Sequence, residues 1–323
     1  MGDMNLETAH DRVDSLLTSI ESAVIGDRSL FEEVLLGILG RGHVLMEDVP
    51  GTGKTLTAKA FATSLGLSFS RIQFTPDLLP ADVTGSHIFS EESGGFEFVP
   101  GPIFANIVLA DEINRAPPKT QAAMLEAMEE GQVTVEDETH ELPQPFLVIA
   151  TQNPIEQEGT FPLPEAQLDR FLVKTAMGYP DVEGYAELLR RRAGRTTQSP
   201  SVERVLEDGE IEAMQQLVET AIHVDDDMLS YMADIAVASE TDHRVRVGIS
   251  PRGAQRLFEA ARAWAVIRER DFVTPDDVRD VAEPVLAHRL VLTAESQVQN
   301  VDKRGVIRDV LSDIPVPTVS SVD

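Results

Sequence analysis

A glycine-rich stretch between an apolar run and a helix-like segment contains the residue types that bind phosphate. Residues 47–55 read E-D-V-P-G-T-G-K-T. Gly51 and Gly53 let the backbone bend so that successive N–H groups point at one anion, and the N-terminus of a following helix adds its positive dipole. Lys54 would reach the β- and γ-phosphates, and Thr55 would offer its hydroxyl to Mg²⁺. The Lys-Thr pair favours a nucleotide site over a glycine-rich surface turn.

The residues around this loop extend the expected site. Ile25 and Gly26 belong to a small apolar turn that could form a wall for a purine base, although a simple connection between two helices fits equally well. Asp48 replaces the first glycine of the usual pattern G-x-x-x-x-G-K-[S/T], so the entrance of the loop departs from the pattern while P-G-T-G-K-T stays whole. The residues expected to contact the nucleotide here are Ile25, Gly26, Pro50, Gly51, Thr52, Gly53, Lys54, Thr55 and Leu56.

Polar side chains also follow two later apolar runs. Asp111 and Glu112 follow the run 107–110, and Asn153 follows the run 146–151. The carboxyl ends of parallel strands are where α/β sheets bind ligands. There, one of the two acids could hold Mg²⁺ while the other orients and activates the attacking water. Asn153 could hold that water or the γ-phosphate without competing for the metal. Two acids after an apolar run are common by chance, but after a phosphate-binding loop they are a strong signal.

Two arginines are candidates for contact with the phosphates. Arg170 ends a short helix expected at 164–170; it could pair locally with Asp169, or project into a neighbouring subunit's nucleotide and stabilise charge on the transferring phosphoryl group. Arg252 lies in the first turn of a helix expected at 250–270, where its side chain and the helix dipole could both face an anion. A solvated surface arginine is the alternative for Arg252.

Alternating strands and helices must position these residues. Helices are expected at 5–23, 28–39, 56–65 and 117–130, and strands at 43–46, 68–74, 107–110, 146–151 and 171–176. An irregular insertion at 76–104 is expected to project from the body, with its core at 85–101, and a β-hairpin at 131–143. The order predicts an α/β fold with a parallel sheet.

The chain becomes mainly helical after Gly178, where we place a domain boundary. The sequence therefore predicts a nucleotide-binding domain at 1–178, a helical domain at 179–313 and a loose tail at 314–323. Ser250-Pro251 and Thr274-Pro275 each put a hydroxyl at the N-cap and proline at the first helical position. Helices are expected at 182–192, 211–222, 227–238, 250–270 and 274–290.

Composition limits the partners. The 323 residues include 55 acidic and 27 basic ones, for a net charge of −28, which would repel nucleic acid and anionic membranes. Without cysteine there are no disulfides or thiolate metal sites, and no apolar run is long enough to span a membrane, so we expect a cytoplasmic protein. The acidic excess also fits a halophile-like protein of a salt-rich cytoplasm, in which screening reduces self-repulsion.

Together these motifs resemble the MoxR family of AAA+ ATPases from about Val24 to Leu290. The stretches that carry the resemblance are residues 74–82, 110–121, 151–154 and 167–171. The resemblance implies an AAA+ P-loop NTPase αβα sandwich with a parallel five-stranded sheet and a small all-α lid domain, and a homo-oligomeric ring of about six subunits. It identifies 85–101 as the helix-2 insert and 131–143 as the pre-sensor-1 hairpin.

The resemblance also implies an activity, an ATPase that uses ATP and Mg²⁺. Family members are chaperone-like remodellers that mature or activate protein complexes, often with metal-cofactor insertion, and they commonly work with a partner bearing a von Willebrand A domain and a protein client. The roles it implies are Walker A for Lys54 and Thr55, Walker B for Asp111 and Glu112, sensor 1 for Asn153, the arginine finger for Arg170, and sensor 2, on the subunit's own ATP, for Arg252.

Two other functions fit the sequence less well. A nucleic-acid motor of the same superfamily conflicts with the acidic composition and with the absence of an appended DNA-binding domain. A nucleotide switch that binds without hydrolysing conflicts with the full set Lys54, Asp111, Glu112 and Arg170.

Overall fold

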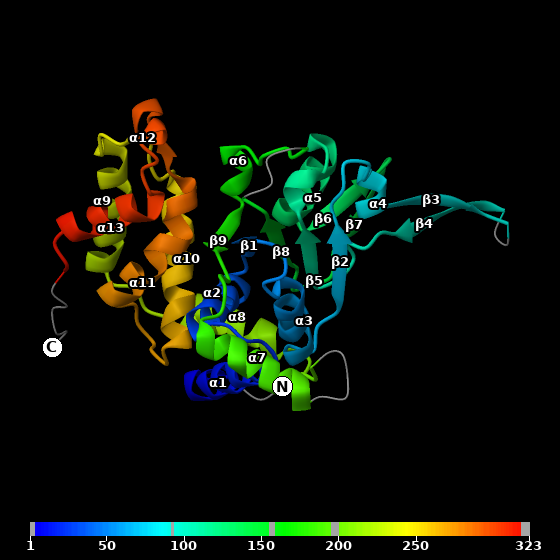
Figure 1. Ribbon diagram of the computed structural model, residues 1–323, viewed down its shortest axis with the longest axis horizontal. Coiled ribbons are helices and arrows are strands. Elements are labelled where there is room, and N and C mark those ends of the chain that lie inside the picture. The colour runs from blue at the N-terminus through cyan, green and yellow to red at the C-terminus, as the bar shows by residue number, and fades with distance from the viewer. Residues whose placement is uncertain (1–3, 92–93, 155–158, 195–199, 318–323) are drawn as a thin grey trace.

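The computed structural model describes residues 4–91, 94–154, 159–194 and 200–317, so the expected tail at 314–323 and the insert at 85–101 lie partly outside the described residues. A five-stranded parallel sheet in the order β2-β5-β8-β1-β9 forms the centre of the first half of the chain (Figure 1). Its strands are β1 (His43–Glu47), β2 (Phe69–Gln73), β5 (Ile107–Asp111), β8 (Leu147–Gln152) and β9 (Phe171–Thr175). The predicted α/β fold is confirmed.

The strand order places the predicted chemical groups next to one another. Strand β8 lies between β1 and β5 and pairs with both. Its register sets Gln152 opposite Glu47, and the N–H of Asp48 continues the pairing by donating to the Gln152 carbonyl at 3.0 Å. Asn153 therefore follows the strand that separates the phosphate-binding loop from the two acids after β5.

Successive side chains along a strand point to opposite faces of the sheet, and each face has its own buried core. In β1, Val44 and Met46 belong to one buried cluster and Leu45 belongs to the other. The first cluster is covered by α1 (Leu6–Ala23), α2 (Arg28–Leu39) and α3 (Lys54–Ser64), and the second by α5 (Pro118–Glu130). Both faces are covered, which explains why the inner strands β5 and β8 are almost wholly apolar, whereas the edge strand β2 carries Ser70, Arg71 and Gln73.

Two hairpins leave this body. The first follows the short helix α4 (Pro80–Thr84) and consists of β3 (Gly85–Ser90) and β4 (Gly95–Pro100). Figure 1 shows it projecting far from the rest of the molecule, as the sequence predicted. The second, β6 (Gln132–Val135) with β7 (Glu138–Glu141), follows α5 and confirms the predicted hairpin.

The second half is mainly helical. Its helices are α7 (Val182–Gly194), α8 (Glu210–Ala221), α9 (Asp226–Thr241), α10 (Pro251–Ile267), α11 (Pro275–Leu286), α12 (Ala294–Val298) and α13 (Lys303–Asp313). Ser250 and Thr274 cap α10 and α11 as predicted, each accepting a backbone N–H. The helix expected at 274–290 is shorter: after Leu286 it gives way to a 3₁₀ turn at 287–289 and to a short strand, β11 (Val291–Leu292), which pairs with β10 (Val245–Val247).

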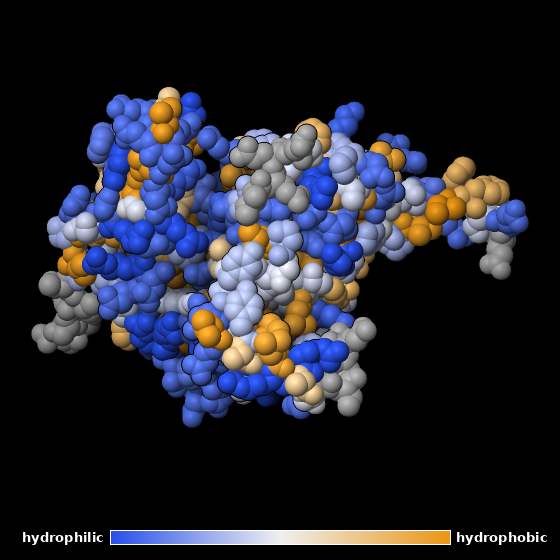
Figure 2. Space-filling view, in the orientation of Figure 1, coloured by the Kyte–Doolittle hydropathy of each residue, from blue (hydrophilic) through white to orange (hydrophobic). Residues whose placement is uncertain are grey.

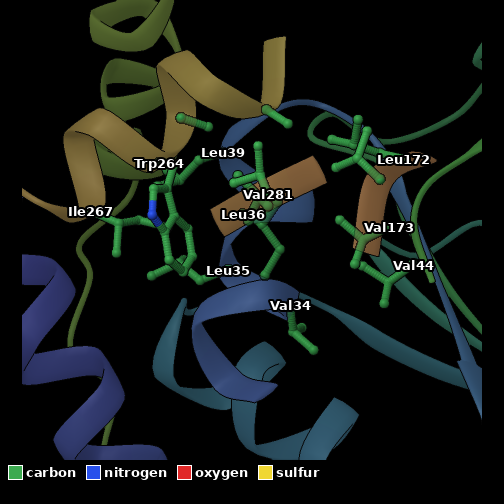
Figure 3. Packing of buried hydrophobic residues seen from close by; sticks show 14 of the residues in the cluster. Val34, Leu35, Leu36, Leu39, Val44, Leu172, Val173, Trp264, Ile267 and Val281 are labelled. Atoms are coloured by element: carbon green, nitrogen blue, oxygen red, sulfur yellow. The ribbon is translucent and has the colours of Figure 1, made fainter. Parts of the chain in front are cut away.

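A single core continues from the sheet into the helical half. Figure 3 shows Leu36 and Leu39 of α2 among Trp264 and Ile267 of α10 and Val281 of α11. Helix α8 is also tied to α2, since Gln215 Nε2 donates to the Ile38 carbonyl at 2.7 Å. The boundary at residue 178 remains a prediction, and the two halves pack as one body. No helix among the described residues is long and apolar enough to cross a membrane.

Candidate nucleotide-binding and hydrolysis site

The loop after β1 has the backbone that phosphate binding requires. Gly51 and Gly53 adopt φ of 87° and 107°, in the left-handed region that favours glycine, and Gly53 immediately precedes α3. The side chain of Lys54 is largely buried, and its Nζ donates to the Asp48 carbonyl at 2.9 Å. Burial lowers the pKa of Lys54, while the negative charges of Asp48, Asp111 and Glu112 oppose that shift. The loop and its lysine are thus preorganised by the protein itself.

Asp48, the departure from the usual loop pattern, has a clear place in this structure. Its carboxylate is buried, with 6% of the residue exposed, and it accepts three backbone N–H groups: Val49 at 2.8 Å, Met177 at 2.9 Å and Gly178 at 3.0 Å. Met177 and Gly178 lie just beyond the end of β9. Asp48 therefore fastens the loop to the segment that leads into the helical half of the chain.

Met177 is a site residue that the sequence did not indicate. A Cβ atom added to Gly53 would lie 3.3 Å from its Cε, and one added to Gly26 would lie 3.7 Å from the same atom. Met177 thus lies against both glycines and brings the turn at Ile25–Gly26 beside the phosphate-binding loop. This arrangement keeps the purine-wall interpretation of that turn open as a prediction.

The acids at the carboxyl end of β5, Asp111 and Glu112, are held by neighbours on both sides. Thr151, at the end of β8, donates from Oγ1 to Asp111 Oδ1 at 2.7 Å and accepts the N–H of Glu112 at 2.8 Å. Arg71, on β2, donates to Asp111 Oδ2 through Nη2 at 2.7 Å and through Nε at 3.2 Å. One carboxylate oxygen of Asp111 is therefore paired with an arginine, and the other accepts a hydrogen bond from a hydroxyl.

Glu112 is constrained in both backbone and side chain. Its φ of 58° lies in the left-handed region, which non-glycine residues rarely occupy. Its Oε2 accepts Gln73 Nε2 at 3.0 Å and Arg115 Nη1 at 3.2 Å. Asn153, after β8, is only 5% exposed. The loop, the two acids and the amide thus lie at the carboxyl ends of the adjacent strands β1, β5 and β8. The sequence predicted this arrangement, because parallel strands end on the same side of the sheet.

The two candidate arginines are brought together by one acid. Glu129, near the end of α5, pairs with Arg170 Nη2 at 2.9 Å and with Arg252 Nη1 at 3.0 Å. Arg170 also donates to the Leu125 carbonyl, so its local partners lie on α5, and the alternative pairing with Asp169 is replaced by Glu129. Asp169 instead lies 3.8 Å from Arg252 Nε and 3.5 Å from the buried Arg289 Nε. Arg252 therefore lies near Arg170, because both pair with Glu129 of α5.

The sheet order, the glycine loop and the acids at the neighbouring strand end define a P-loop ATPase of the AAA+ class. A family model described as "ATPase family associated with various cellular activities" matches residues 43–173, and an AAA lid domain model matches residues 237–310. The chain belongs to the MoxR family of AAA+ ATPases. ATP hydrolysis and nucleotide binding follow from this membership.

Individual relatives cover nearly the whole chain. It is 44% identical to the uncharacterized protein YeaC of Bacillus subtilis across 98% of both chains. It is 40% identical to chaperone MoxR1 of Mycobacterium tuberculosis, across 96% of this chain and 84% of that protein. The crystal structure of an inferred ATPase from Cytophaga hutchinsonii superposes with a TM-score of 0.90 at 35% identity, covering 97% of each chain.

Proposed function

We propose that the chain couples ATP hydrolysis to chaperone-like remodelling of protein complexes during their maturation or activation. The observation that carries this proposal is a set of exposed apolar side chains on the projecting β3–β4 hairpin of an ATPase. Phe96 is 73% exposed, and Ile88 and Phe89 are more than half exposed on the paired strand. Figure 2 shows apolar surface along the projecting arm, on the side of the molecule away from the helical half. Apolar side chains held away from the body suit contact with another protein.

In this proposal the phosphates of ATP bind to the N–H groups of the loop and to Lys54. Thr55 and Asp111 would hold Mg²⁺, which would neutralise charge on the phosphates. Hydroxyl and carboxylate oxygens are the donors that Mg²⁺ prefers, so the residues present fit this ion. Because Arg71 pairs with Asp111 Oδ2, we expect that ion pair to open when the metal arrives.

Glu112 is proposed to orient and deprotonate the attacking water, with Asn153 holding the water or the γ-phosphate. Both functions need the side chains at the carboxyl ends of adjacent strands, which is where they lie. The bonds from Gln73 and Arg115 leave Glu112 engaged within its own subunit, so it must be released for turnover. Loss of the γ-phosphate would remove the contacts that it makes with the site, such as that with Asn153. The helical lid domain and the two hairpins could then shift.

Arg170 is proposed to act on the nucleotide of a neighbouring subunit in a homo-oligomeric ring of about six. Arg252 was expected at its own subunit's γ-phosphate. Its pairing with Glu129, which also pairs with Arg170, favours instead a role beside Arg170. ATP bound at a subunit boundary would then pair with Arg170 and Arg252 in place of Glu129. After hydrolysis, both arginines would pair with Glu129 again.

The remaining expectations are proposals that follow from family membership: a cytoplasmic location, a protein client, a partner with a von Willebrand A domain, and metal-cofactor insertion in the client. A nucleic-acid partner is disfavoured by the net charge of −28. DNA-stimulated hydrolysis at the working salt concentration would revive that alternative.

A trapping experiment tests the proposal. Glu112→Gln should bind ATP with near-normal affinity while turnover falls by about 10²-fold or more, and the ATP-loaded variant should retain client proteins from native extract. Adding Phe96→Ser should release those clients without changing ATP binding. Val298→Ser, on an apolar residue that is 83% exposed on α12, is the matched control. Client retention that ignores Phe96→Ser would contradict the role of the hairpin.

A further inference from the structure

Three potential metal ligands from the two hairpins meet away from the nucleotide site. His87 belongs to β3, and Glu138 and His140 belong to β7. Glu138 and His140 are two residues apart on one strand, so their side chains share a face. One nitrogen or oxygen atom from each of the three residues lies within 4.8 Å of the others. Residues about fifty positions apart are thus gathered at the junction between the two hairpins.

The distances fit a shared ion better than direct hydrogen bonds. Glu138 Oε2 lies 3.5 Å from His87 Nε2 and 3.8 Å from His140 Nε2. An N–H···O hydrogen bond in proteins is about 2.7–3.2 Å long. A tetrahedral ion with bonds of about 2.0–2.1 Å separates its ligand atoms by about 3.4 Å. The two measured separations are therefore close to the edges of such a tetrahedron.

The imidazole rings are held in place by aromatic packing. Phe98 stacks on His140 with ring centres 3.8 Å apart and planes 9° apart, and its ring centre lies 5.7 Å from that of His87. Within the part of the chain that the structure describes, His140 Nε2 is buried and has no hydrogen-bond partner. A buried ring nitrogen without a partner is costly, and a bound cation would satisfy it.

We propose that His87, Glu138 and His140 form a Zn²⁺ site that joins the two hairpins. Two imidazole nitrogens and one carboxylate suit Zn²⁺, whereas Mg²⁺ and Ca²⁺ prefer oxygen donors throughout. Glu136 Oε2 lies 3.6 Å from His87 Nδ1, longer than a hydrogen bond, and by moving closer it would support that ring through its second nitrogen, as carboxylates commonly do behind zinc-bound histidines. Three protein ligands leave a fourth position for water or for a side chain of another protein.

The site would restrain motion between the hairpins. The β3–β4 hairpin carries the exposed apolar side chains Ile88, Phe89 and Phe96, and the β6–β7 hairpin directly follows α5, which holds Glu129. An ion shared by the two hairpins would fix the base of the β3–β4 hairpin to the β6–β7 hairpin. The β6–β7 hairpin in turn follows α5, whose Glu129 pairs with Arg170 and Arg252. This inference stands without the proposed remodelling function, because it depends only on the ligand cluster.

Metal titration of the nucleotide-free, full-length chain tests the site. After treatment with a chelator, the protein is titrated with Zn²⁺ against a chromophoric competitor, and one equivalent per subunit is expected to bind. His87→Gln, His140→Gln and Glu138→Gln should each weaken binding by about 100-fold or more, since losing a supporting contact alone costs about 10–100-fold. Glu136→Gln should weaken it by about 10-fold. Millimolar Mg²⁺ should not displace the Zn²⁺.

His223→Gln is the matched control, because His223 also lies beside a carboxylate, Asp225, at 2.9 Å, but far along the chain. It should bind Zn²⁺ as the parent does. Co²⁺ should give the strong visible absorption of low-coordinate cobalt in the parent and lose it in His140→Gln. Circular dichroism of the metal-free variants checks that they fold. Absence of binding in the parent, or equal binding in a His87→Gln/His140→Gln double variant, overturns the proposal, and a metal-free histidine–glutamate ion-pair cluster would then remain.

Discussion

The Asp48 carboxylate accepts the backbone N–H of Gly178 at 3.0 Å, joining the phosphate-binding loop to the start of the segment after β9. The neighbouring N–H of Met177 reaches the same oxygen at 2.9 Å. The loop and the path into the helical half are therefore coupled by a buried charge. A phosphate that moves the loop would also move residue 178.

Replacing Asp48 should lower the stability of the fold and also alter Lys54 in the nucleotide site. Asp48→Asn removes one acceptor oxygen facing backbone N–H groups, so we expect a loss of about 1–3 kcal/mol in the free energy of unfolding. It should also lower the pKa of Lys54 further, because the charge of Asp48 opposes that shift. Chemical denaturation and ATP titration measure the two effects. Asp234→Asn, an exposed carboxylate on α9, should change neither, and unchanged stability in Asp48→Asn would contradict the anchor.

Release of Glu112 should raise basal turnover. Gln73 donates to the Glu112 carboxylate at 3.0 Å, and breaking one such bond is worth about 1 kcal/mol, so Gln73→Ala should increase kcat roughly fivefold with little change in KM. Steady-state ATP hydrolysis measures this, with Ser70→Ala on the same strand as control. A fall in kcat would instead mean that Gln73 holds Glu112 in its working position.

Mixing subunits should reveal on which nucleotide each arginine acts. Arg170→Ala subunits should regain activity when mixed with Lys54→Ala subunits, because each supplies what the other lacks across the boundary. Arg252→Ala should behave in the same way if it acts beside Arg170. Rescue of Arg170→Ala without rescue of Arg252→Ala would return Arg252 to its own subunit's ATP. Size-exclusion chromatography must confirm that each mixture assembles.

Stability should fall in mild acid because of His43. Burial is the main cause that lowers the pKa of His43 to about 4, and nearby Arg256 lowers it further, against the carbonyl of Met128. The ring accepts the Val148 N–H at Nδ1 and faces the Met128 carbonyl with Nε2, so it is neutral when folded. Its contribution is complete above pH 6.5 and lost as the pH falls toward 4, by about 3 kcal/mol in total.

Urea unfolding at pH 7 and pH 5 measures this dependence, and His43→Gln should reduce the difference between the two. Part of the pH dependence should remain in His43→Gln, because burial also lowers the pKa of His288 well below its ordinary value. Its variant His288→Gln should reduce the remaining difference. A pH dependence that is unchanged in both variants would assign the effect to other groups.

Added salt should stabilise the fold. With a net charge of −28, repulsion between carboxylates exceeds what the surface ion pairs offset, and screening shortens its range from about 10 Å at 0.1 M salt to about 3 Å at 1 M. The urea midpoint should therefore rise between these concentrations of KCl. A midpoint that falls or stays constant would count against the halophile-like interpretation.

The sequence by itself determined the local chemistry and the class of fold. Glycines at 51 and 53 were needed where φ is positive, a lysine and a threonine began the next helix, and apolar runs ended in Asp111 and Asn153. These features depend on neighbours along the chain and on the strand period, so they can be deduced from residue order. The β6–β7 hairpin and the caps of α10 and α11 were predicted for the same reason, whereas the insertion at 76–104 was predicted only as an irregular projection and contains the β3–β4 hairpin.

Only the tertiary structure decided which distant residues meet. Asp48 with Gly178, Thr151 with Asp111, and Glu129 with both arginines depend on strand order and on the packing of α5 and α10. Neither strand order nor the seating of one helix against another is encoded in local periodicity. For that reason the sequence named Arg252 as a phosphate ligand but could not place it beside Arg170, and it gave no sign that His87 and His140 lie together.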